Sequence, residues 1–348
     1  MKIRWTDKAA FWAINHLLSR ARHQRFDSVQ FDQFVEKWSS RNAAEFYDID
    51  VSTAAGKTAD PSLQALSVWN GCRRFQVVLP TPDPTGCDQN DHIWVEFHLG
   101  HPIDRAPIFL IQHGLRSVSV RGYHRMCREL NQLGVNAGVL HLPYHFSRRP
   151  RGSFNGELAI TSDVARSAYT IRQGVREVCW LKNQLKLLGA PAVGLWGTSY
   201  GAWISAMALT LDAGFDGALL LEPPVEIEEL FWEMPLFSNL QKELTRLNIP
   251  RERVRQQFRL VTPYHYPVRI DPERVLILGS VYDPIGYPDS LRRLNQAWPG
   301  SYLEIFPYGH ISYRLHTSAV ERFLSVLAPQ LKLQAASHKP WTAKNVVL

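Results

Sequence analysis

The segment around Ser199 has the composition of a turn that can present a nucleophile. Residues 197–201 read Gly-Thr-Ser-Tyr-Gly, a G-x-S-x-G pattern; the apolar segment 192–196 precedes it, and the helix-like segment 201–211 follows it. A strand–turn–helix setting of this kind holds a serine in a strained conformation with its Oγ exposed. The flanking glycines let neighbouring backbones approach closely. These residues predict a nucleophilic serine next to a helix whose first amides face the reaction centre.

The elements that must position this serine follow a regular order from about residue 73. Segments 75–79 and 92–98 have strand character and flank a proline-rich turn, which predicts an antiparallel hairpin. Apolar strands and helices then alternate: strands 107–112, 136–141, 192–196, 217–221, 274–278 and 302–306, and helices 121–133, 163–188, 201–211, 290–297 and 318–327. This alternation predicts an α/β fold, with a mainly parallel sheet and helices on both faces.

With these features the chain resembles the α/β-hydrolase superfamily over about residues 73–332. The resemblance implies a catalytic order of nucleophile, acid and histidine, and a helical cap, here at about 224–270. It also implies a hydrolase that cleaves a carboxylic ester, thioester or amide through an acyl-Ser199 intermediate. No metal or cofactor is implied, and a dehalogenase would carry Asp in place of this serine.

The resemblance places the acid in the loop after the strand that follows the cap, where Asp283 lies. Members of the superfamily often show G-x-x-D here, whereas Asp283 comes four residues after Gly279. Glu222, at the end of the preceding strand, is the main alternative, and Asp289 and Asp271 are further candidates. Asp283 is the predicted acid, and the choice between it and Glu222 stays open.

The same resemblance places the base after the last strand, where His310 is the first histidine and His316 the fallback. His310 would take the proton from Ser199 and return it to the leaving group. The expected oxyanion donors are the backbone amides of Tyr200 and of Leu115, which follows the His-Gly pair at 113–114.

Four side chains are further candidates for contact with the substrate. His113 precedes Ser199 and therefore breaks the catalytic order, so we expect it to brace its loop, with a substrate contact as the alternative. Arg148 and Arg149 lie in a loop that follows the carboxyl end of a strand, the side where ligands bind in open α/β sheets. They either contact an anionic substrate group or are solvated. Trp232 belongs to the aromatic residues of the cap, most of which should pack the cap, with one or two lining an apolar pocket.

The composition, the net charge and the cysteines limit the class of protein further. With 45% hydrophobic and 20% charged residues among 348, the chain has the composition of a folded globular protein. Its net charge of +7 comes from scattered residues, so nucleic-acid binding is not predicted. The four cysteines show no CxxC pair and no metal-ligand spacing, which argues against a disulfide framework or a zinc site and favours a reducing compartment.

Three regions are expected along the chain: an N-terminal helical extension (1–70), the hydrolase domain (71–332) and a C-terminal tail (333–348). Segment 9–18 follows basic residues, contains Asn15 and His16 and lacks a small-x-small cleavage site, so it is interpreted as a basic amphipathic helix and a candidate for peripheral membrane contact. No apolar run reaches the ~18 residues of a membrane span, which favours a cytoplasmic protein. The expected partner is a small acyl substrate. A non-catalytic binding protein on the same fold and an acyltransferase are the alternative functions. The sequence makes no prediction of the oligomeric state.

Overall fold

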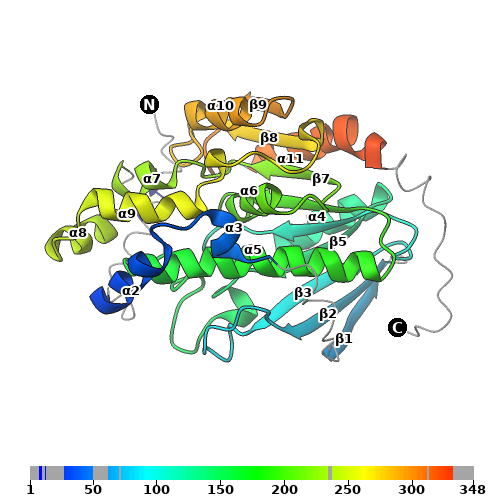
Figure 1. The fold of residues 1–348 in the computed structure, drawn as a ribbon. Helices are drawn as coiled ribbons and strands as arrows, with labels where there is room; N and C mark the ends of the chain where they lie inside the picture. The colour runs from blue at the N-terminus through cyan, green and yellow to red at the C-terminus, as the bar shows by residue number, and fades with distance from the viewer. Residues whose placement is uncertain are drawn as a thin grey trace.

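The computed structural model describes residues 27–49, 62–69, 72–233, 237–311 and 313–331, together with residues 8, 9 and 12. In this part of the chain, nine strands form one sheet in the order β1-β2-β3-β5-β4-β6-β7-β8-β9 (Figure 1). The strands are β1 (Ser62–Trp69), β2 (Cys72–Pro80), β3 (His92–Leu99), β4 (Ile108–Gln112), β5 (Asn136–His141), β6 (Val193–Thr198), β7 (Gly217–Leu221), β8 (Val275–Ser280) and β9 (Tyr302–Phe306). The main helices are α2 (Ser28–Trp38), α3 (Ala43–Tyr47), α4 (Arg121–Gln132), α5 (Val164–Leu187), α6 (Tyr200–Leu211), α7 (Ile227–Glu233), α8 (Ser238–Arg246), α9 (Arg251–Phe258), α10 (Pro288–Ala297) and α11 (Tyr313–Arg322).

The sheet is antiparallel at one side and parallel over the rest. Strands β1, β2, β3 and β5 pair antiparallel, whereas β5, β4, β6, β7, β8 and β9 pair parallel. The predicted hairpin and the mainly parallel sheet are therefore confirmed. Because β4 and β6 are neighbours, with Gln112 opposite Gly197, the loops that follow these two strands emerge side by side.

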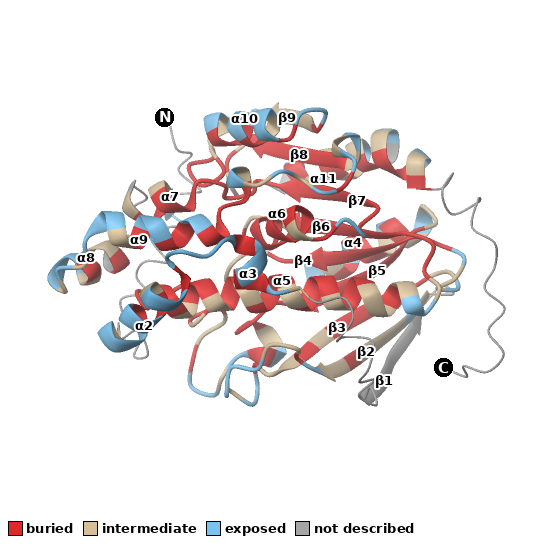
Figure 2. Ribbon diagram, in the orientation of Figure 1, coloured by how far each residue is buried: buried red, intermediate tan, exposed pale blue. Residues whose placement is uncertain are grey.

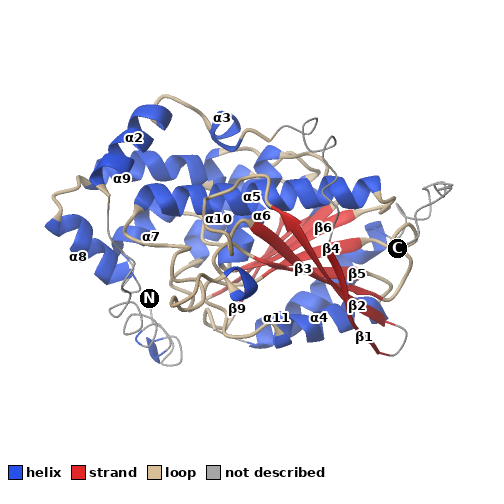
Figure 3. Cartoon of the chain, turned by 90° about the horizontal axis from the view of Figure 1, so that it is seen from below, coloured by secondary structure: helices blue, strands red, loops and turns tan. Residues whose placement is uncertain are grey.

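Helices cover both faces of the sheet. Figure 3 shows α5 and α6 on one side of the strands and α4 and α11 on the other. Side chains alternate accordingly along β4: Ile108 and Leu110 pack with the α5 and α6 side, and Phe109 and Ile111 with the α4 and α11 side. A strand covered on both faces has apolar residues in succession, as this segment does. Figure 2 shows that the central strands are buried, whereas α8 and α9 expose much of their surface.

The cap lies between β7 and β8, as the sequence predicted, and consists of α7, α8 and α9. Aromatic side chains hold it together: the Phe231 ring centroid lies 4.9 Å from that of Phe237 and 4.3 Å from that of Phe258. These rings stabilise the cap itself, which is the packing role expected for most of its aromatic residues.

The N-terminal extension differs from its prediction. Residues 62–69 form the edge strand β1, so assigning all of 1–70 to a helical extension is wrong for this segment. Helices α2 and α3 do form, and Phe34 and Phe46 of these helices pack against Tyr169 of α5. Apart from residues 9 and 12, segment 9–18 lies outside the described residues, as does the predicted tail 333–348. Among the described residues, no helix has the length and apolarity needed to cross a membrane.

Candidate active site

Ser199 lies at a strained turn between β6 and α6. Its backbone angles are φ 51° and ψ −115°, which an L-residue rarely adopts. The turn admits only glycine on either side: a Cβ at Gly197 would lie 2.4 Å from the Ala202 Cα, and one at Gly201 would lie 2.4 Å from the Gln112 carbonyl oxygen. The Ser199 amide donates to the Leu221 carbonyl at 2.8 Å, which ties the turn to the end of β7. The backbone therefore fixes where the serine side chain is presented.

A continuous hydrogen-bonded chain joins Ser199 to a histidine and an acid. The Ser199 Oγ lies 2.9 Å from His310 Nε2, and His310 Nδ1 lies 2.9 Å from Asp283 Oδ2. The other carboxylate oxygen of Asp283 accepts the Ile285 amide at 2.7 Å, and Asp283 is fully buried. The three side chains that the sequence selected, separated by up to 111 positions, meet in one site. His316 lies within α11 and Asp271 caps a short turn, while Asp289 pairs with Arg292 at the surface.

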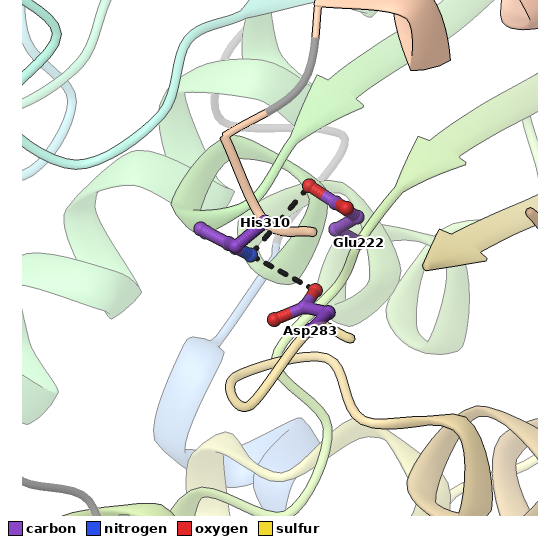
Figure 4. Close-up of side chains that lie close together, drawn as sticks. All are labelled: Glu222, Asp283 and His310. Atoms are coloured by element: carbon purple, nitrogen blue, oxygen red, sulfur yellow. Dashed lines mark hydrogen bonds and ion pairs between the residues drawn. The ribbon is translucent and has the colours of Figure 1, made fainter. Parts of the chain in front are cut away.

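A second carboxylate approaches the same histidine. Glu222 Oε2 lies 3.5 Å from His310 Nδ1, and Figure 4 shows Glu222 and Asp283 both directed at this edge of the ring. Among the described residues, Glu222, Asp283 and His310 form a group with ligand atoms within 4.8 Å of one another, close enough to hold a metal ion. A cation there would replace the Nδ1 proton that the chain from Ser199 to Asp283 requires. Binding a metal and aligning the histidine would therefore be competing uses of these residues.

The two predicted oxyanion donors lie beside the serine. Tyr200 is the first residue of α6, so its amide has no partner within the helix. Gly114 borders Ser199 directly, since a Cβ at Gly114 would lie 3.7 Å from the Ser199 Cβ, and Leu115 follows it. Neither amide donates a hydrogen bond to another described residue. Both are thus available to a negatively charged oxygen near Ser199.

Comparisons with known proteins agree with this architecture. The chain matches acetyl xylan esterase from Paenibacillus sp. R4 with a TM-score of 0.62 at 15% identity, over 89% of this chain and 98% of the other. It matches acetyl xylan esterase 1 from Thermoanaerobacterium sp. JW/SL YS485 with a TM-score of 0.62 at 14% identity, over 91% and 98% of the two chains. At these identities the likeness shows the fold. The chain has the α/β-hydrolase fold.

Sequence comparisons add less. No family model matches the chain. Two uncharacterised proteins of Mycobacterium tuberculosis, from strains CDC 1551 and H37Rv, are each 22% identical to it over 290 residues, which cover 82% of this chain. The chain spans 63% of the length of these relatives. These sequence comparisons assign no family, and the confirmed part of the prediction is the α/β-hydrolase fold, through the solved structures.

Two buried histidines brace the loop that follows β4 in this hydrolase fold. His113 Nδ1 donates to the Gly114 carbonyl at 2.9 Å, and its Nε2 accepts the Leu142 amide at 3.1 Å. His145 Nε2 accepts the Arg116 amide at 3.1 Å. Burial lowers the pKa of His113 well below its usual value and that of His145 to about 3, so both rings are neutral.

The two hydrogen bonds of His113 thus fit the expectation that it braces its loop. A polar contact between His113 and a substrate would require one of its two hydrogen bonds to break. His145 was not among the residues predicted from the sequence. The available signal was its position four residues after the end of β5, at the same edge of the sheet as the loop after β4.

Both alternatives predicted for Arg148, contact with an anionic substrate group and exposure to solvent, are wrong. The side chain is fully buried, and its guanidinium donates to both carboxylate oxygens of Glu177 on α5, at 2.5 and 2.7 Å. It also donates to the carbonyls of Asn90 at 2.6 Å and His141 at 3.1 Å. This bidentate pair ties the loop after β5 to α5.

The other two candidates for substrate contact keep their predicted status. Arg149 is exposed next to the buried pair. Trp232 is half-buried on α7, with the Arg251 guanidinium 5.8 Å from its ring centroid. A contact of either side chain with a substrate stays a prediction.

Proposed function

We propose that this protein is a serine hydrolase that cleaves a carboxylic ester, thioester or amide through an acyl-Ser199 intermediate. The observation that carries the proposal is the pair of 2.9 Å contacts joining Ser199, His310 and Asp283. A serine hydroxyl is a weak nucleophile unless an oriented base removes its proton. This arrangement supplies the base and the acid that orients it.

The proposed reaction begins with proton transfer from Ser199 Oγ to His310 Nε2 as the oxygen attacks the substrate carbonyl carbon. Asp283 accepts the Nδ1 hydrogen, which selects the tautomer with a free Nε2 and stabilises the imidazolium that forms. The imidazolium then protonates the leaving group, and an acyl-enzyme remains on Ser199. A water molecule, deprotonated by His310, releases the acid product and restores the serine.

The amides of Tyr200 and Leu115 are the proposed donors to the tetrahedral oxyanion. Their support is position: one opens α6 directly after the nucleophile, and the other lies in the braced loop beside it. Donors fixed before the reaction do not have to reorganise as the charge develops. Each such donor therefore lowers the activation barrier by several kcal/mol, which raises kcat by a factor of order 10²–10³. The neutral histidines that hold the loop after β4 would preserve this geometry.

Carboxylic esters are the substrates to test first. Two solved structures of the same fold that match nearly the whole chain are named acetyl xylan esterases. Arg148, which could have indicated an anionic substrate, is fully buried in an ion pair. These observations favour a neutral, short-chain acyl ester as the starting point.

The direct test is hydrolysis of p-nitrophenyl acetate, butyrate and octanoate, with an acyl-CoA as a thioester, by the wild type and by Ser199→Ala. We expect the wild type to turn over at least one ester and Ser199→Ala to lose that activity by at least about 10³-fold. Ser290→Ala is the matched control, because it removes a buried serine hydroxyl on α10 whose hydrogen-bond partner among the described residues is the Tyr287 carbonyl. A Ser199→Ala variant as active as Ser290→Ala would contradict the proposal.

A further inference from the structure

Two carboxylates lie close to the His310 ring, and each belongs to a residue that follows one of two neighbouring strands. Glu222 directly follows β7 and Asp283 comes three residues after β8, and these strands pair parallel with Leu221 opposite Leu278. Glu222 is 3% exposed and Asp283 is fully buried, so both approach the ring where water screens charge weakly. A triad requires one acid, so the second carboxylate calls for an explanation.

The backbone of Glu222 is held in an unusual conformation. Its φ of 49° lies in the left-handed region, which a residue with a long side chain rarely occupies. Its amide donates to the Leu278 carbonyl at 2.7 Å, while the preceding Leu221 carbonyl accepts the Ser199 amide at 2.8 Å. Residues 221–222 therefore connect the nucleophile turn to the end of β8. Strain of this kind persists where the surrounding structure fixes it, and it concentrates at functional sites.

The loop that carries Asp283 packs closely on Glu222. A Cβ built at Gly286 would lie 3.0 Å from the Glu222 carbonyl group and 3.1 Å from Asp283 Oδ2. Glycine at this position lets the two acid-bearing segments come together. The spacing of the two carboxylates is thus set by backbone packing as well as by side-chain rotamers.

The two carboxylates differ in what they can do for the ring. A neutral imidazole has one N–H, and the 2.9 Å distance makes Asp283 its acceptor, whereas 3.5 Å is at the limit of a hydrogen bond. Electrostatic attraction falls off more slowly with distance than hydrogen bonding does. Glu222 can therefore stabilise the imidazolium without accepting the hydrogen.

We propose that Glu222 is a second positioning carboxylate of this site, one that stabilises protonated His310 beside Asp283 and accepts the Nδ1 hydrogen when Asp283 is removed. The proposal rests on the proposed hydrolase function. It makes two claims that a purely structural glutamate would not satisfy: the pH–rate profile depends on Glu222, and the importance of Glu222 increases when Asp283 is absent.

The test is a double-mutant cycle of Glu222→Gln and Asp283→Ala, with kcat, KM and the pH profile measured on an ester that the wild type hydrolyses. For Glu222→Gln alone we expect the acid limb of kcat/KM to move to lower pH by about one unit, because a negative charge that favours the imidazolium is lost. We expect Asp283→Ala to keep about 1% of wild-type kcat, above the roughly 10⁴-fold loss seen where a lone acid is replaced. Adding Glu222→Gln to Asp283→Ala should lower kcat by a further factor of about 10².

The matched control is Glu226→Gln. Glu226 is a buried glutamate of the same segment after β7, and it pairs with Arg293. This variant should change the free energy of unfolding while leaving the pH profile in place. If Asp283→Ala does not fold, Asp283→Asn replaces it in the cycle.

Two results would overturn the inference: an unmoved acid limb in Glu222→Gln, or a Glu222→Gln effect on kcat that is no larger without Asp283 than with it. Either result leaves the hydrolase proposal intact, because the wild type would still be active and dependent on Ser199. A wild type that hydrolyses none of the esters and does not react with a serine-directed probe would instead refute the proposed function.

Discussion

Replacing Arg148 by alanine should lower the free energy of unfolding of this protein and leave its substrate preference unchanged. The guanidinium forms a bidentate pair with Glu177, and both side chains are fully buried. Removing the cation leaves a buried carboxylate that, within the described part of the chain, keeps a hydrogen bond from the Thr81 hydroxyl at 2.6 Å. It also removes the hydrogen bonds that two backbone carbonyls accept from Arg148, those of Asn90 and His141.

The expected loss of stability follows from removing one partner of a buried ion pair and leaving the other. Leaving one charge unpaired in a protein interior destabilises the fold by about 3–5 kcal/mol. Since folded domains are stable by about 5–15 kcal/mol in total, the Arg148→Ala variant should lose a large part of its stability. Arg148→Met with Glu177→Leu should recover much of the loss, because no buried charge then remains.

The assay is urea unfolding followed by circular dichroism, together with KM for a neutral and an anionic ester. Arg149→Ala is the matched control, since this neighbouring arginine is exposed and its removal should change the free energy of unfolding by less than about 0.5 kcal/mol. An Arg148→Ala variant within about 1 kcal/mol of the wild type, with a raised KM for the anionic ester alone, would refute the reasoning.

Two further predictions concern the turn that carries Ser199 and the histidine His145, which braces the loop after β4. Gly201→Ala should lower the unfolding midpoint and abolish activity, because its Cβ would lie 2.4 Å from the Gln112 carbonyl oxygen; Gly114→Ala should stay folded, because its nearest contacts are 3.6 Å or more. Equal thermal midpoints for the two variants would contradict this steric account. His145 has its pKa lowered by burial to about 3, against about 6.5 when unfolded, so its contribution to stability is complete above about pH 6.5 and is lost as the pH falls towards 3. His145→Gln should therefore be less stable at neutral pH but should lose less stability on acidification, and an unchanged dependence of the free energy of unfolding on pH in urea titrations would oppose this.

Much of the fold could be predicted because its signals are local. The apolar segment 136–141 matches β5 at both ends, and 217–221 matches β7, since short apolar runs between turns are typical of buried parallel strands. Strand β1 was missed although a signal was present. Trp69 pairs with Cys72, and the two residues between them are Asn and Gly, the dipeptide that favours tight hairpins.

The residues of the site were predictable to the extent that chain order and element ends define them. Ser199 is marked by its own pattern, and His310 by its place after the last strand. The roles of Arg148 and Glu222 depend on partners that only the tertiary structure brings near. Glu177 lies 29 residues from Arg148 along the chain, and nothing local to either residue indicates a buried pair. The position of Glu222 beside His310 likewise follows from the pairing of β7 with β8.

The central claim, that Ser199 is an activated nucleophile, can be tested without knowing the substrate. The protein is incubated with a fluorophosphonate, the adduct is quantified by intact-mass spectrometry, and the labelled peptide is sequenced. We predict one adduct per chain, located on Ser199, that forms in the wild type and in Ser290→Ala and is absent from Ser199→Ala and strongly slowed in His310→Ala. A folded wild type that takes up no label, or that carries it on another residue, would contradict the account.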